Sequence, residues 1–120
     1  MYTKQIKWME GCEWKYEDYS DNQLWEIINM LSMTVNFEML EMFLEDNEYG
    51  NISIVIGIRS EGIQMLDTPR AYVHVHQVNY EDTPDELANF KKEAYRIKNL
   101  LRNKYPDKWV TSSFSWRGFN

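Results

Sequence analysis

The chain has 120 residues, of which 43% are hydrophobic and 15% aromatic. This length fits one domain and the aromatic content argues against disorder, so we expect a single folded domain over residues 1–120. The net charge is −6 at pH 7. Residues 1–60 hold eleven carboxylates against four basic side chains, while residues 61–120 are nearly balanced. Because phosphate binding needs cationic surface, this charge argues against nucleic acid and permits a basic protein partner, or it simply keeps the domain soluble.

Cys12 is the single cysteine, so no internal disulfide is expected. The N-terminal sequence MYTKQIKWMEG lacks the apolar run of a signal peptide. No stretch approaches the ~18 apolar residues that would indicate a membrane span. These features predict a cytoplasmic protein without a membrane partner.

The N-terminal part combines an aromatic segment with a helix. Residues 1–18 are rich in aromatic side chains and allow a strand. Ser20 and Gln23 then form a capping box, which predicts a helix over about residues 21–31. Four apolar side chains at helical spacing form its expected buried face: Leu24, Ile27, Ile28 and Leu31.

The middle of the chain has the patterns of strands. Residues 35–44 are open to two interpretations, because their apolar side chains fit either the alternation of a strand or one face of a helix. We expect a strand, since a turn at residues 46–51 would pair it with the isoleucine-rich segment 52–58. Residues 62–66 form a short strand or the arm of a turn. A further strand is expected at 72–78.

The C-terminal part begins with the clearest helix signal. Thr83 is placed as the N-cap, Pro84 occupies the first helical position, and Glu86 completes a capping box. A helix is therefore expected over about residues 84–105. Alternating side chains over residues 110–116 predict a final strand.

Adjacent strands flanked by helices do not form regular βαβ units. Hairpin-linked strands imply antiparallel pairing. We therefore expect an α+β fold with an antiparallel β-meander of four to five strands. Two helices would pack on one face, leaving the other face at least partly exposed.

Two histidines are the main candidates for chemistry that the sequence offers, because acidic neighbours favour an inert thiol at Cys12. His74 and His76 are two residues apart on a predicted strand, so they would share one face and could hold a metal or act as an acid–base pair. A catalytic metal site needs a third ligand, which the sequence does not identify. The other interpretation is two half-exposed strand residues, and we predict no metal and no cofactor.

Aromatic and acidic side chains alternate just ahead of the first helix. Tryptophan and tyrosine are enriched at binding hot spots, and carboxylates steer a basic partner. The other interpretation is that the rings pack on the sheet while the acids solvate its edge. The candidate partner-binding residues are Glu13, Trp14, Tyr16, Glu17, Asp18 and Tyr19, with a second acidic group at Glu45, Asp46 and Glu48.

The leading hypothesis is a non-catalytic protein-binding domain. Its specific form is a small acidic inhibitor of a basic bacterial or phage effector, such as a nuclease or toxin, of the immunity, antitoxin or phage counter-defence type. One alternative is a metal-dependent or acid–base enzyme that uses His74 and His76. Another is a homo-oligomeric structural or regulatory subunit, such as a homodimer formed through an unpaired strand edge.

Overall fold

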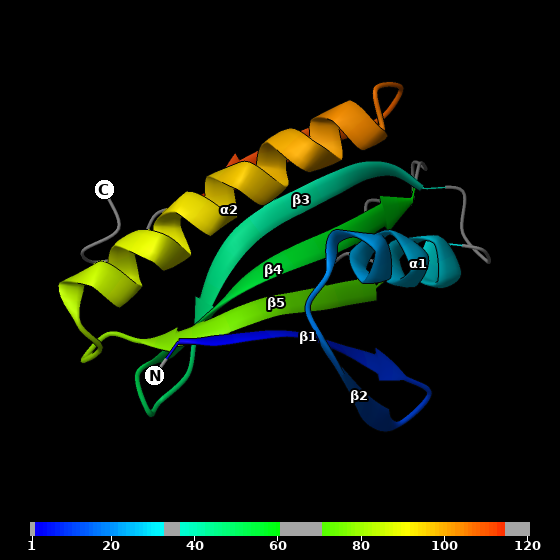
Figure 1. Ribbon diagram of the computed structural model, residues 1–120. Coiled ribbons are helices and arrows are strands. Elements are labelled where there is room, and N and C mark those ends of the chain that lie inside the picture. The colour runs from blue at the N-terminus through cyan, green and yellow to red at the C-terminus, as the bar shows by residue number, and fades with distance from the viewer. Residues whose placement is uncertain (1, 33–36, 61–70, 115–120) are drawn as a thin grey trace.

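The computed structural model describes residues 2–32, 37–60 and 71–114 (Figure 1). Six strands and two helices follow one another along this part of the chain. In chain order they are β1 (Thr3–Glu10), β2 (Glu13–Asp18), α1 (Asp21–Ser32), β3 (Phe37–Asp46), β4 (Asn51–Ser60), β5 (Ala71–Asn79), α2 (Pro84–Lys104) and β6 (Trp109–Ser113).

The strands form one mixed sheet in the order β2-β1-β5-β4-β3-β6. Neighbouring strands are antiparallel except β3 and β6, which run parallel. The expected antiparallel meander of four to five strands is therefore wrong, although the α+β class holds. The difference arises at both edges: the N-terminal hairpin adds two strands beside β5, and α2 carries the chain across so that β6 enters alongside β3 in the same direction.

Several local predictions are confirmed. Residues 37–46 form a strand, and they pair with β4 through the expected hairpin. The Oγ of Ser20 accepts a hydrogen bond from the backbone N–H of Gln23 at 3.0 Å. Thr83 caps α2 in the same way, with its Oγ1 3.2 Å from the backbone nitrogen of Glu86. The predicted segment 62–66 lies outside the described residues. The final strand expected at 110–116 forms over Trp109–Ser113, Phe114 lies beyond its end, and residues 115 and 116 are outside the described part of the chain.

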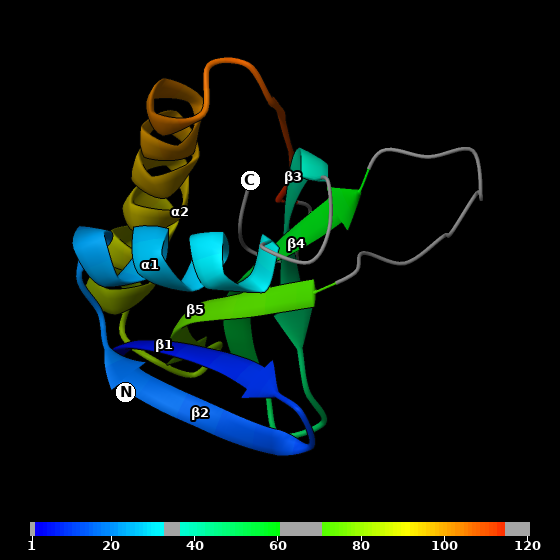
Figure 2. The ribbon, with the colours of Figure 1, turned by 90° about the vertical axis from the view of Figure 1, so that its right-hand side faces the viewer.

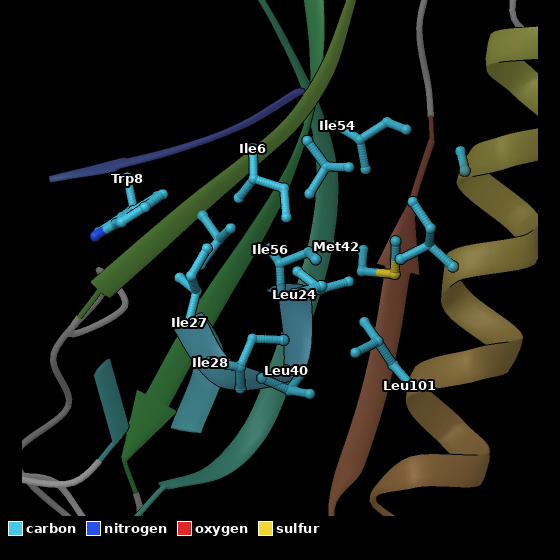
Figure 3. Close-up of a cluster of buried hydrophobic side chains, with 14 of the residues drawn as sticks. Ile6, Trp8, Leu24, Ile27, Ile28, Leu40, Met42, Ile54, Ile56 and Leu101 are labelled. Carbon is cyan, nitrogen blue, oxygen red and sulfur yellow. The ribbon is translucent and has the colours of Figure 1, made fainter. Parts of the chain in front are cut away.

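Both helices cover the same face of the sheet, as the turned view shows (Figure 2). Their apolar stripes meet alternate side chains of the strands in one continuous core (Figure 3). Ile56 of β4, Ile28 of α1 and Leu101 of α2 are all fully buried there. Burying such side chains contributes about 1.5–3 kcal/mol each. The opposite face of the sheet carries no helix within the described part of the chain, and we call it the open face.

Candidate functional site

The site begins with the hairpin of β1 and β2. Its turn is the dipeptide Gly11–Cys12, and Gly11 has a φ of 64°, a value that glycine adopts without steric strain. The pairing then proceeds without interruption from the Glu10–Glu13 pair onward. This register places Trp14 and Tyr16 on the open face of β2, which is an edge strand of the sheet.

A row of side chains crosses the open face from one edge of the sheet to the other. Successive strand pairings define it, because directly paired residues point to the same face. Lys7 lies between an aromatic ring on one side and an imidazole on the other. From β2 to β6 the row is Tyr16, Lys7, His74, Val55, Phe43 and Ser113.

Lys7 and His74 hold the Trp14 ring in place. The Lys7 Nζ lies 4.5 Å from the Trp14 ring centroid and 5.8 Å from that of Tyr16, within the range of cation–π attraction. The His74 and Trp14 rings meet edge to face at 5.6 Å. Two neighbours therefore fix the orientation of an indole that stands on an edge strand.

His74 is held in its neutral form near pH 7. Burial lowers the pKa of its imidazole, and the cationic Lys7 lowers it further, while Glu45 opposes the shift. A neutral imidazole accepts the edge of an indole without adding a second positive charge beside Lys7.

Trp14 and Tyr16 are the exposed aromatic residues of this segment. Their side chains are 43% and 59% exposed. Tyr19 differs, because its ring packs 4.6 Å from that of His76 and its hydroxyl donates a hydrogen bond to Asp21 at 2.6 Å. Burial, followed by that hydrogen bond, raises the pKa of Tyr19 well above its usual range.

The acidic candidates fall into two groups on strands that are not neighbours in the sheet. Glu13, Glu17 and Asp18 are exposed on β2, and Glu13 pairs with Lys15 at 3.1 Å. The second group, Glu45, Asp46 and Glu48, lies at the β3–β4 turn. Strands β1, β5 and β4 lie between β2 and β3, although Asp18, which pairs with Gln5, stands toward the same end of the sheet as the β3–β4 turn. The two groups are therefore separate surfaces.

The two histidines lie on opposite faces, so the expectation that they share one face is wrong. His76 has a φ of 59°, and the pairing of β5 with β4 shifts register at this point. Such a bulge adds one residue and resets the alternation of side chains. His74 stays on the open face, whereas His76 turns under the helices and is 2% exposed.

His76 belongs to a polar cluster that joins both helices to the sheet. Its Nε2 lies 3.4 Å from Oε1 of Glu93, and its Nδ1 has no hydrogen-bond partner among the described residues. Arg96 of α2 binds Glu93 and reaches Asp21 of α1 at 3.2 Å. The guanidinium lowers the pKa of both carboxyl groups. Nothing in the local sequence signals this cluster, because it depends on the bulge.

The open face also contains a hollow near its other edge. It has a volume of about 590 Å³ and a partly buried ion pair, Arg59 Nε to Glu41 Oε2 at 2.9 Å. Phe43 and Tyr72 form an aromatic wall, with their rings edge to face at 6.3 Å. Sequence reasoning missed this hollow, since it requires strands β3, β4, β5 and β6 to be placed side by side.

Within the described residues, no three histidine, cysteine or acidic side chains are grouped so that they could hold a metal ion. None of the described helices is both long and apolar enough to cross a membrane. Comparisons with protein-family models, with curated proteins and with solved structures found no match to this chain.

Proposed function

We propose that this chain is a non-catalytic protein-binding domain that inhibits a basic effector protein, such as a nuclease or toxin, in the cytoplasm of a bacterial or phage-infected cell. The observation that carries the proposal is the exposure of Trp14 and Tyr16 on an edge strand. We call the β2 surface the set of Trp14, Tyr16 and Asp18 on the open face together with Glu13 and Glu17 on the other face of the same edge strand.

The rigidity of the two rings supports a binding role. Large aromatic side chains supply contact area at a low cost in conformational entropy when they are already ordered. Trp14 is ordered by Lys7 and His74, and both rings rise from a regularly paired hairpin. A partner would therefore lose little free energy in fixing them, which is the condition for an interface hot spot.

The charge of the β2 surface supports a basic partner. Glu17 and Asp18 are exposed and form no ion pair with any residue that the structure describes. Carboxylates at the rim of an interface accelerate association with a cationic protein and weaken binding to acidic ones. Inhibition would follow by occlusion, with the carboxylates covering the lysines and arginines that the effector uses on its own substrate.

Affinity capture from bacterial lysate tests the proposal. We expect the wild-type chain to retain a basic protein, to release it as salt rises and to inhibit its activity. Trp14→Ala combined with Tyr16→Ala should weaken this binding at least tenfold, about 1.4 kcal/mol.

Trp109→Ala provides the matched control, because Trp109 is 66% exposed on the opposite edge strand. Its removal should leave the capture unchanged. The proposal fails if the retained proteins are acidic, or if the double variant captures the same basic protein as well as the wild type does.

A further inference from the structure

We infer that the edge of β2 accepts an extended, basic segment of the partner as an additional strand. The inference rests on the proposed function and specifies how the β2 surface is used. It follows from three features of the hairpin: the direction of its backbone groups, the regularity of its pairing and its charge.

The two-residue turn determines which backbone groups of β2 face outward. In such a hairpin the residues that flank the turn, here Glu10 and Glu13, exchange backbone hydrogen bonds. Hydrogen-bonded and non-hydrogen-bonded pairs then alternate along the ladder. The N–H and C=O groups of Trp14 and Tyr16 consequently point away from β1, on the side where the described sheet ends.

The edge of β2 lacks most of the devices that prevent strand addition. Exposed edges are usually protected by proline, by a bulge, by short length or by inward-pointing charge. β2 pairs with β1 over six consecutive residues without a register shift, and it contains no proline. Its central lysine, Lys15, is engaged with Glu13. The edge is therefore regular enough to pair with another strand.

Charge selects the occupant of this edge. β2 holds three carboxylates and one lysine, a net of −2, so two copies of β2 would bring a net charge of −4 together, whereas a cationic strand would offset the charge of β2. A strand with alternating cationic side chains would instead place two of them opposite Glu13 and Glu17, and the one between them opposite Lys15, whose charge Glu13 already offsets. Its intervening side chains would lie beside Trp14 and Tyr16 on the open face. Main-chain hydrogen bonds would supply affinity, and this alternation would supply specificity.

Amide hydrogen exchange with a synthetic peptide tests strand addition on the unmodified chain. The probe is an eight-residue peptide in which lysine alternates with valine or threonine. At saturation we expect exchange at the Trp14 and Tyr16 amides to slow at least tenfold, while the inward-facing amides of Lys15 and Glu17 change little. The same peptide with glutamate in place of lysine should have no effect.

A pair of variants at position 16 isolates the backbone contribution. Tyr16→Thr and Tyr16→Pro both remove the ring, but only proline removes the outward N–H. An edge strand tolerates proline where the N–H faces solvent. We expect peptide binding to be at least tenfold weaker for proline than for threonine. Strand addition would be overturned if the peptide binds the two variants equally, or if it perturbs the Trp14 and Tyr16 rings without protecting the backbone amides. Either result would still be compatible with an interface formed by side chains. Strand addition by a partner would also be overturned if light scattering reveals a dimer and hydrogen exchange shows the same amides protected without the peptide.

Discussion

At the scale of single residues, His76 determines which side chains reach the helices. Its positive φ and the register shift beside it place Val75 and His76 consecutively in the buried layer. The result is a buried imidazole that is approached by side chains of β1, of α2 and of the residues next to β1 and α1. Tyr2 and Tyr19 contact its ring, and Glu93, Arg96 and Lys4 influence its charge.

The pH dependence of stability should report this buried imidazole. Burial lowers the pKa of His76, and Lys4 and Arg96 add to the shift, while Glu93 opposes it. The unfolded chain binds a proton near the ordinary pKa of about 6.5, whereas the folded chain does not. The free energy of unfolding should therefore fall as pH decreases from about 7 to 5.

Urea denaturation at several pH values measures this effect. His76→Asn removes the titration and tolerates a positive φ, so the slope between pH 7 and 5 should decrease. His74 contributes with the same sign, because its pKa is also lowered, and His74→Asn is the matched variant. An unchanged slope in His76→Asn would contradict the assignment.

At the scale of elements, the two hairpins turn at glycines in different surroundings. Gly11 and Gly50 have φ values of 64° and 81°. A Cβ at Gly11 would meet no atom within 4 Å, whereas at Gly50 it would lie 2.1 Å from Cε1 of Tyr80. The β1–β2 turn therefore depends on backbone conformation alone, and the β3–β4 turn depends also on a packed ring.

Alanine substitutions at these glycines should differ in their effect on stability. Gly11→Ala should lower the free energy of unfolding by about 1–2 kcal/mol, the ordinary penalty of the left-handed region. Gly50→Ala should lower it further, because the Tyr80 ring must move. Chemical denaturation measures both. In a Tyr80→Ala background, the additional loss of unfolding free energy caused by Gly50→Ala should become smaller. Equal losses of unfolding free energy in Gly11→Ala and Gly50→Ala would refute this account.

Local signals predicted the helices and the central hairpin, because each is specified within a short segment. The α2 cap needs only Thr83, Pro84 and Glu86, and all three lie within one turn. The parallel pairing of β6 with β3 could not be predicted in this way. It joins residues about 70 positions apart, such as Leu40 and Val110, and no local pattern records which edge a returning chain will reach.

The candidate site divides in the same manner. The alternation of residue types in one segment identified the rings and carboxylates of β2 as candidates, but it left open whether the rings stand outward or pack on the sheet, and Tyr19 packs against His76. The shared face of His74 and His76 was predicted wrongly, since a bulge depends on simultaneous pairing with strands on both sides. The contacts of Lys7 and His74 with the Trp14 ring could not be predicted either, because they require β1 and β5 to be neighbours.

At the scale of the whole molecule, the fold separates the apolar core from the proposed interface. Both helices cover one face of the sheet and bury the apolar core, so the open face and the β2 edge are not needed to close it. Substitutions of Trp14 or Tyr16 should therefore affect partner binding far more than folding. This separation makes the proposed interface testable without unfolding the protein.

The most direct test is fluorine NMR of the chain labelled with 5-fluorotryptophan, mixed with the basic protein recovered by capture. The account predicts that the Trp14 signal shifts and loses its sensitivity to solvent, while the signal of Trp109, which is more exposed, does not change. A complex in which Trp14 stays solvent-exposed and unshifted would contradict the central claim that β2 contacts the partner.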